Sequence, residues 1–289
     1  MPTLTTLVNF DSSGNGAWLP RAGLLTDASG NLFGVTGGGG PNNSGTILEI
    51  ANTGTFANPV YASAATTLAV FDGTNGSNLL FGSLIVDGDG NLFGAAANGG
   101  ANGIGTVYEL AKTPTGYAST PTVLTSFSGP DGSFPYGGLV ADAAGNLIGT
   151  TNQGGTFLSG SSGNLGHGVV YEIAKTPTGY ASTPTVLLDF DGPGGYGAYP
   201  DDTLIADSAG DLFGTASDSG IGTGTIFEIP KTPSGYGTAT VLVAFNGADG
   251  FNPANGLVAD TNGNLFGSTL NGGANGHGVV YELAKTPSG

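Results

Sequence analysis

Residues 30–34 read Gly-Asn-Leu-Phe-Gly, and this pentapeptide decides the fold because it returns four more times along the chain. It recurs unchanged at 90–94 and 263–267, as Gly-Asn-Leu-Ile-Gly at 145–149 and as Gly-Asp-Leu-Phe-Gly at 210–214. The successive copies are 60, 55, 65 and 53 residues apart. Self-similarity with spacings of this size indicates a repeat architecture in which each copy is one supersecondary unit.

Each copy of the pentapeptide lies in the same frame of short apolar runs. A run such as Gly-Leu-Val-Ala-Asp precedes it, a run such as Gly-Thr-Val-Tyr-Glu-Leu follows it, and Thr-Val-Leu-x-x-Phe completes the unit. Short runs rich in Val, Ile, Leu, Phe and Thr and bounded by Gly, Pro, Asn or Asp are strand signals. No segment has the 3.6-residue apolar period of a helix. Each unit is therefore predicted to contain four strands.

Five units of four strands match a β-propeller. The chain opens with a lone run of the fourth-strand type, residues 4–10, whereas the fifth unit lacks that strand. We therefore predict an all-β fold, a single five-bladed β-propeller with four antiparallel strands per blade, whose N-terminal strand closes the last blade and so removes an exposed edge. The predicted blades of this one domain, 1–289, are 22–71, 82–127, 137–190, 203–245, and 256–284 together with 4–10.

Charge and composition exclude several classes of function. Five basic against 21 acidic residues give a formal net charge of −16, which disfavours binding to nucleic acid or to an anionic membrane surface. The sequence contains no apolar stretch of about 18 residues, so we expect no membrane insertion, and no signal-peptide pattern occurs at residue 1. Cysteine is absent, which excludes disulfides and thiolate metal sites. The Gly-, Thr- and Asn-rich, Lys-poor composition suggests a secreted or cell-surface bacterial protein.

The combined pattern, Asp-x-x-Gly-Asn-Leu-Phe-Gly followed by Gly-Gly and by Gly-Thr-Val-x-Glu-Leu, resembles the GloVer repeat of Gloeobacter and Verrucomicrobia over nearly the whole chain. It is similar, more loosely, to the Asp-x-x-Gly-Asn-Leu-Tyr hairpin of NHL-type propellers. The resemblance implies a secreted or surface-anchored bacterial protein. It carries over no catalytic residue.

Residues that recur in all repeats are interpreted as structural. An Asp opens the turn between the first and second strands of each unit, a Glu recurs in each third strand, and four of the five basic residues open a Lys-Thr-Pro segment. We expect the Asp to cap the turn, the Glu to accept structural hydrogen bonds and the Lys to bond nearby carbonyls or carboxylates. The run Asp87-Gly-Asp-Gly-Asn superficially resembles the start of a calcium loop but lacks its downstream Glu. No cofactor is predicted, with calcium as the alternative.

The repeats vary in the loops that lead into the first strand and in those between the second and third strands. A propeller places these loops on one face, and function tends to lie on loops carried by a rigid scaffold. Aromatic rings beside a few directed polar groups suit a sugar-binding surface. The candidate ligand-binding residues are Trp18, Arg21, Phe81, Tyr136, Tyr199, Asp201, His167 and His277.

We predict an extracellular binding module, monomeric because a closed ring is self-sufficient, for a glycan or another cell-surface ligand. A polysaccharide-cleaving hydrolase or lyase that uses Asp201, Asp202, Tyr136, His167 and Arg21 is the first alternative. A structural or adhesive spacer is the second. His167 and His277 occupy the same repeat position, and a metal site would need help from Asp201 or Asp202. Shared ancestry of the repeats explains the two histidines more simply, so no metal site is predicted.

Overall fold

The computed structural model describes residues 4–10, 16–40, 42–156, 166–190, 195–217, 223–253 and 256–286. Within these ranges the ordered elements are all β-strands, as the sequence predicts, and no helix that could cross a membrane occurs there. The chain divides into two compact units, Met1–Ser126 and Phe127–Gly289. Each unit is described by itself, and the prediction of one five-bladed domain stays a prediction.

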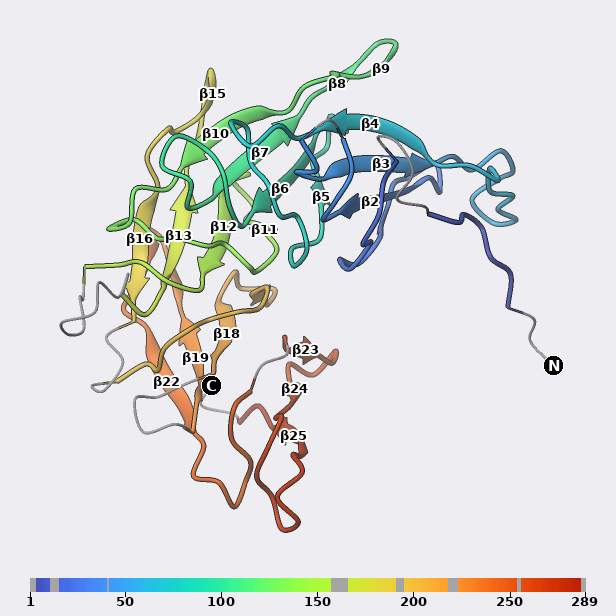
Figure 1. The fold of residues 1–289 in the computed structure, drawn as a ribbon. Coiled ribbons are helices and arrows are strands. Elements are labelled where there is room, and N and C mark those ends of the chain that lie inside the picture. Colours follow the sequence, from blue (N-terminus) through green and yellow to red (C-terminus); the bar gives the residue numbers. More distant parts are fainter. Residues whose placement is uncertain are drawn as a thin grey trace. The chain divides into compact units, whose positions relative to one another are not determined.

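The N-terminal unit contains two four-stranded antiparallel sheets (blue to green in Figure 1). Sheet 1 has the order β1-β2-β3-β4, with β1 at Leu25–Thr26, β2 at Leu32–Thr36, β3 at Thr46–Ile50 and β4 at Thr66–Val70. Sheet 2 has the order β5-β6-β7-β10, with β5 at Ile85–Val86, β6 at Leu92–Ala96, β7 at Thr106–Leu110 and β10 at Thr122–Ser126. Both sheets therefore follow the predicted order of strands within a repeat.

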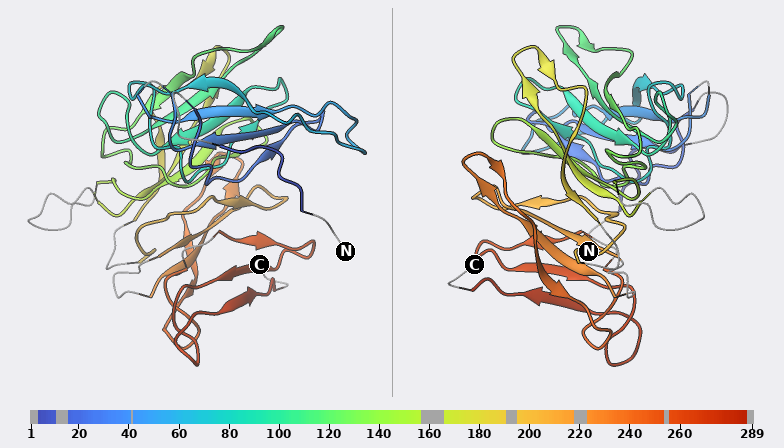
Figure 2. Two further views of the ribbon diagram at one scale, coloured as in Figure 1. Left: turned by 45° about the vertical axis from the view of Figure 1, so that its right-hand side comes forward. Right: turned by 90° about the vertical axis from the view of Figure 1, so that its left-hand side faces the viewer.

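The C-terminal unit repeats this plan in sheets 3 and 4 (Figure 2). Sheet 3 comprises β11 at Val140–Ala141, β12 at Leu147–Thr151, β13 at Val169–Ile173 and β16 at Thr185–Asp189. Sheet 4 comprises β17 at Ile205–Ala206, β18 at Leu212–Ala216, β19 at Thr225–Ile229 and β22 at Thr240–Ala244. Sheet 5 has three strands, β23 at Val258–Ala259, β24 at Leu265–Ser268 and β25 at Val280–Leu283.

A small hairpin follows the third strand of sheets 2, 3 and 4. The hairpins pair β8 (Lys112–Thr113) with β9 (Gly116–Tyr117), β14 (Lys175–Thr176) with β15 (Gly179–Tyr180), and β20 (Lys231–Thr232) with β21 (Gly235–Tyr236). In each hairpin the Lys lies directly across from the Tyr. The sequence does not predict strands in these Lys-Thr-Pro segments, because two-residue strands leave no alternating pattern to detect.

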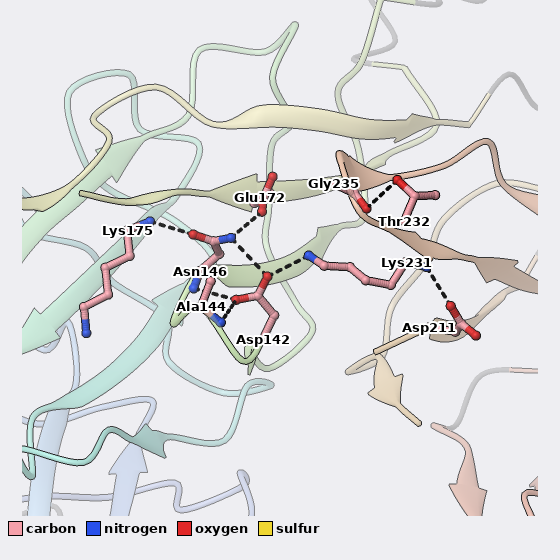
Figure 3. Close-up of polar contacts among 9 residues, drawn as sticks. All are labelled: Asp142, Ala144, Asn146, Glu172, Lys175, Asp211, Lys231, Thr232 and Gly235. Carbon is pink, nitrogen blue, oxygen red and sulfur yellow. Dashed lines mark hydrogen bonds and ion pairs between the residues drawn. The ribbon is translucent and has the colours of Figure 1, made fainter. Parts of the chain in front are cut away.

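The Asp of each first turn organises a hydrogen-bond network that explains the Asn of the pentapeptide. In sheet 3, one carboxylate oxygen of Asp142 accepts the backbone N–H groups of Ala144 and Asn146, and the other accepts the Asn146 side-chain amide. The same amide group donates to Glu172, and the side-chain oxygen Oδ1 of Asn146 accepts the backbone N–H of Lys175 (Figure 3). The network therefore ties the first turn to the third strand and to the start of the hairpin.

The predicted structural roles of the repeated residues are confirmed where the structure describes their contacts. Both carboxylate oxygens of Asp87 accept hydrogen bonds within its own turn, so the turn is the capped hairpin expected rather than a calcium loop. Lys231 Nζ lies 2.8 Å from Asp142 Oδ2, and Lys285 Nζ lies 3.7 Å from Asp207 Oδ2. Lys231 and Lys285 therefore each bind a turn carboxylate of the preceding sheet.

The core lies between neighbouring sheets of a unit and is built from the middle strands. In the N-terminal unit, Phe33, Ile47 and Phe71 of sheet 1 pack with Leu92 and Tyr108 of sheet 2. In the C-terminal unit, sheets 3 and 4 pack through a cluster that includes Ile148, Val170, Phe190, Leu212 and Phe227. Aromatic side chains bury the largest areas, so this recurrent stacking of Phe and Tyr carries much of the hydrophobic stabilisation.

Residues 4–10, for which the sequence predicts the closing strand, form no strand in the structure, and Leu4 is fully exposed. In sheet 5, Val280 of the last strand is 84% exposed. The closing strand and the count of five blades therefore stay predictions. What the structure establishes is an all-β chain of repeated, mostly four-stranded antiparallel sheets.

Candidate functional site

The loop that leads into each first strand, called here the leading loop, lies against the loop that follows the second strand. Isolated backbone bridges join the two loops in four sheets: Trp18 to Gly38, Ser77 to Asn98, Ser133 to Gln153, and Phe251 to Asn271. Within each of these sheets the two variable loops therefore share one end of the strands, as predicted. The Asp turns and Lys-Tyr hairpins are formed at the other end of the strands.

A residue with a left-handed backbone precedes the proline of four leading loops. Leu19, Phe134, Tyr199 and Asn252 have φ between 55° and 62°, a region that costs a non-glycine residue roughly 1–2 kcal/mol. The carbonyl of each accepts an N–H from the first or second residue after the second strand, for example Asn152 N–H to Phe134 at 3.0 Å. This bond holds the unfavourable conformation and fixes the path of the leading loop.

The leading loop of sheet 4, residues 195–204, carries the two carboxylates Asp201 and Asp202. The amide of Asn152, from the loop after β12, donates to Asp201 Oδ1 at 2.5 Å. Asp202 Oδ2 is buried, and no hydrogen-bond donor of the described residues reaches it. Burial of a charged carboxylate without a donor is costly, so this oxygen would gain from a donor that the described residues do not supply.

Burial raises the pKa of both carboxylates. Burial and the charge of Asp201 raise the pKa of Asp202 to about 6. Burial also raises the pKa of Asp201, although the hydrogen bond from Asn152 opposes the shift. Around pH 6 the charge of Asp202 therefore responds to small changes in pH or in ligand hydrogen bonding.

Sheets 3 and 5 both approach Asp202 within the C-terminal unit. Thr150 of β12 donates its hydroxyl to the Asp202 carbonyl at 3.0 Å. Gly137 of the third leading loop lies so close that a Cβ there would be 2.6 Å from the same carbonyl oxygen, which requires glycine at that position. Burial, followed by the charge of Asp202, raises the pKa of Tyr281 in β25 to about 12. Sheet 3 therefore holds the backbone at Asp202, and the Asp202 charge acts on Tyr281 of sheet 5.

The rings of His167 and Tyr199 are in contact, and Tyr199 lies two residues before Asp201 in the sequence. Their rings meet edge to face with centroids 5.6 Å apart, and the Tyr199 N–H donates to the His167 carbonyl at 2.8 Å. His167 is buried, whereas His277, at the same repeat position, is exposed. No group of three His, Asp or Glu side chains in the described ranges is placed to hold a metal ion. The two histidines thus share a repeat position without sharing an environment.

The other predicted site residues are located as follows. Tyr136 is half-buried in the third leading loop, one residue before Gly137. In the N-terminal unit, Trp18 donates its Nε1–H to Asn43 Oδ1 at 2.8 Å and lies against Gly38. Arg21 is exposed and Phe81 is 49% exposed. Within the C-terminal unit, His167 is in contact with Tyr199, and Tyr199 lies two residues before Asp201. No described side-chain contact joins His277 to these three residues.

The sequence does not single out Asn152, Thr150 or Tyr281 as parts of the site, and Asp202 enters the sequence-based predictions only in the enzymatic alternative and in a metal site that is not predicted. Asn152 is a break in the repeats that could have been noticed, since the equivalent residues are Gly37, Ala97, Ser217 and Leu270. Thr150 and Tyr281 lie on strands and follow the repeat pattern there, so nothing in the sequence distinguishes them.

Comparison with solved structures finds only distant likeness. An α-L-arabinofuranosidase from Clostridium thermocellum is 11% identical, with 79% of this chain and 74% of that chain covered and a TM-score of 0.42. An endo-arabinase from Bacteroides thetaiotaomicron is 14% identical (98% and 99% covered, TM-score 0.44), and a protein of unknown function from Dyadobacter fermentans is 10% identical (86% and 74%, TM-score 0.49). At such TM-scores the likeness carries no conclusion about activity.

Comparison with known sequences gives one result. No curated protein matches the chain. The sequence model of the Gloeobacter/Verrucomicrobia repeat matches residues 155–289. The resemblance carried by the pentapeptide frame is therefore confirmed for the C-terminal part of the chain, in which sheets 4 and 5 and the Asp201–Asp202 pair lie.

Proposed function

We propose that the chain is a binding module for a neutral glycan and that the ligand binds at the leading loop of sheet 4. The observation that carries this proposal is the buried Asp202 oxygen for which the described residues supply no donor, next to a second carboxylate that is held by Asn152. Sugar hydroxyl groups donate strong hydrogen bonds to carboxylates. Tyr199, whose ring rests edge to face on the buried His167, adds aromatic surface of the kind on which the apolar face of a sugar ring packs.

The charge of the chain narrows the class of glycan. A formal charge of −16 and two adjacent carboxylates repel uronate-bearing or sulfated polysaccharides. A neutral polysaccharide carries no such penalty. We therefore expect recognition of uncharged sugars with vicinal hydroxyl groups.

The proposal includes a five-bladed ring in which residues 4–10 supply the fourth strand of sheet 5. The run Thr5-Thr-Leu-Val-Asn-Phe10 matches Thr240-Val-Leu-Val-Ala-Phe245, which contains β22 of sheet 4. In such a ring the predicted ligand residues Trp18, Arg21 and Phe81 would join the rim around Asp201. The proposal also takes the protein to be a monomer that lies outside the cell or on its surface.

Affinity electrophoresis tests the binding proposal. The purified chain is run through native gels cast with neutral polysaccharides, and in parallel through gels with acidic ones, both with and without calcium. Retardation by at least one neutral polysaccharide is expected. Asp201→Ala and Asp202→Ala should lose it, and the fold should tolerate them because other repeats have Ala254 and Ala22 at these positions. Asp89→Asn, a charge change at the exposed turn of sheet 2, is the matched control.

Two outcomes would contradict the proposal. Equal mobility in every gel would exclude glycan binding and favour a spacer or a protein-binding role. Retardation that survives in both Asp variants would place the binding surface elsewhere on the chain.

One observation favours an enzymatic alternative, a polysaccharide hydrolase or lyase. With a pKa of about 6, Asp202 is partly protonated at mildly acidic pH and could act as a general acid, with Asp201 as the second carboxylate. Staining the same gels for polysaccharide clearing separates the two functions. An enzyme should lose clearing in Asp202→Asn while retaining retardation, whereas a binding module should never clear the gel.

A further inference from the structure

Sheet 3 and its loops contact the leading loop of sheet 4 at five consecutive residues, 199–203. Four of these contacts fix the backbone of one loop or the other: the Tyr199 N–H on the His167 carbonyl, Pro200 against Gly168, the Asp202 carbonyl on the Thr150 hydroxyl, and the Thr203 hydroxyl on the Gly138 N–H. The fifth contact is the hydrogen bond from the Asn152 amide to Asp201 Oδ1, at 2.5 Å. This bond acts on the carboxylate itself rather than on the path of the loop.

The backbone of Asn152 is fixed independently of this bond. Its N–H donates at 3.0 Å to the carbonyl of Phe134, the left-handed residue of the third leading loop. The Asn152 side chain therefore starts from a fixed backbone and reaches a carboxylate on a loop that is itself fixed. Such a contact holds the carboxylate in one orientation before a ligand arrives, which is the role of a supporting residue around a binding site.

The other repeats show that the fold does not require this bond. The residues equivalent to Asn152 are Gly37, Ala97, Ser217 and Leu270, and those equivalent to Asp201 are Arg21, Phe81, Tyr136 and Ala254. None of these residues carries an amide or a carboxylate in its side chain. The amide and the carboxylate therefore break the repeat pattern together, and they do so beside the buried Asp202 oxygen. A structural role common to the repeats does not explain such a pair.

The hydrogen bond also favours the charged form of Asp201. Burial raises the pKa of the Asp201 carboxyl, and the bond from Asn152 opposes that shift. The titratable groups near this carboxyl are Asp202 and Tyr199 on the same loop, Tyr136 in the third leading loop, His167 before β13 and Tyr281 in β25. Asn152 adds an uncharged donor to this set, so it stabilises the ionised carboxylate without neutralising it.

We propose that Asn152 is the positioning residue of the glycan site. Its amide engages Oδ1 of Asp201, so that Oδ2 accepts one hydroxyl group of the sugar while the buried Asp202 oxygen accepts another. The inference rests on the proposed glycan-binding function and adds the residue that orders one of the two acceptors. Without the amide, the Asp201 carboxylate loses its fixed orientation and part of the stabilisation of its charge.

Affinity electrophoresis with the neutral polysaccharide that retards the wild type most strongly measures the effect. Asn152→Ala should bind on the order of tenfold more weakly, because the carboxylate loses a charge-assisted hydrogen bond. The fold should tolerate this variant, since Ala97 stands at the equivalent position. Asn152→Asp keeps the size of the side chain but removes the donor, so at pH 7 it should bind no better than Asn152→Ala.

Asn98→Ala is the matched control. The Asn78 amide donates to Asn98 Oδ1 at 2.9 Å, which is likewise a side-chain bond between a leading loop and the loop after a second strand. No carboxylate takes part in it. The control should therefore keep the wild-type affinity to within about twofold, as expected for a substitution away from the binding site.

A readout without ligand separates the positioning role from glycan binding. Carbon-13 NMR titration of the aspartate carboxyl groups, assigned with Asp201→Asn and Asp202→Asn, follows the pKa of Asp201 in each chain. Loss of the donor should raise this pKa in Asn152→Ala, whereas Asn98→Ala should leave it unchanged. Since binding uses the ionised carboxylate, the acid limb of the retardation profile should move to higher pH in Asn152→Ala.

Three outcomes would contradict these expectations. An unchanged Asp201 pKa in Asn152→Ala would overturn the positioning role, whatever the chain binds. Wild-type affinity in both Asn152 variants would overturn the positioning role and leave the proposed glycan binding in place. Absence of retardation in the wild type, together with a raised Asp201 pKa in Asn152→Ala, would overturn the proposed function and with it the role of Asn152 in binding.

Discussion

Asp202 has a buried carboxylate oxygen at a position where the other repeats have Ala22, Gly82, Gly137 and Asn255. Its pKa of about 6 in the folded chain exceeds the ordinary value of 3.8. The folded chain therefore binds this proton more tightly than the unfolded chain does. Its contribution to stability is fully present below pH 4 and is lost as the pH rises through 6.

Asp202→Asn should remove that pH dependence. We expect wild type to lose stability, on the order of 1 kcal/mol after allowance for solvent screening, between pH 4 and pH 6.5, and the variant to lose less. Melting temperatures recorded at half-unit intervals from pH 3.5 to 7.5 measure the difference. Parallel curves for wild type and variant would show that Asp202 is not buried as described.

The candidate site illustrates what the sequence could and could not predict at this scale. The sequence identifies Tyr199 and Asp201 because each lies in a leading loop, at a position where the residue differs between repeats. The bond from Asn152 to Asp201 joins residues 49 positions apart on neighbouring sheets. Such a contact depends on how one sheet packs on the next, which the alignment of repeats within a chain does not reveal.

At the scale of the element, the hydrogen-bond network of the first turn recurs in all five repeats, with Asn in four of them and Asp211 in sheet 4. Asn146 alone donates to Asp142 and Glu172 and accepts the Lys175 N–H. Asn146→Ala should therefore cost about 2–3 kcal/mol in the free energy of unfolding, because several partly buried groups lose their partner together. Urea unfolding measures this loss.

The chain supplies the control for that prediction. Asp211 occupies the position of Asn146 in sheet 4 and accepts the Lys231 N–H at 2.6 Å. Asn146→Asp should therefore keep the bond to Lys175 and lose less stability than Asn146→Ala. An equal loss in both variants would mean that the donor bonds of Asn146 account for the whole effect.

Four strands per repeat and the capped first turn followed from the sequence because each has a local signature: an apolar run, or Asp and Gly at fixed offsets. The Lys-Tyr hairpins did not, since their strands are two residues long and a proline interrupts the run. Their structural role appears only when the tyrosine is seen packed on the preceding sheet.

At the scale of the whole molecule, the proposed ring closure gives a direct cross-linking prediction. In sheet 4, Ile226 pairs with Val243, and the equivalent residues are Val280 in β25 and Val8 in the N-terminal run. The chain has no cysteine, so the doubly substituted Val8→Cys, Val280→Cys chain contains a single possible disulfide. Closure predicts that mild oxidation forms it within one chain, detected by mass spectrometry and by a mobility shift on non-reducing gels.

Val8→Cys combined with Val258→Cys is the matched control for this experiment. Val258 lies in β23, at the other edge of sheet 5, and is also exposed. Cross-linking of the control pair to the same extent would show a mobile N-terminal segment rather than a strand in register.

The left-handed residue before the leading-loop proline has a practical consequence. Because its carbonyl is tied to the loop after the second strand, the path of the leading loop does not depend on the side chain that follows the proline. That position holds Arg21, Tyr136 and Asp201 in three of these loops. The same positions can therefore be randomised together in a display library, so that new specificities are selected on a backbone that is already fixed.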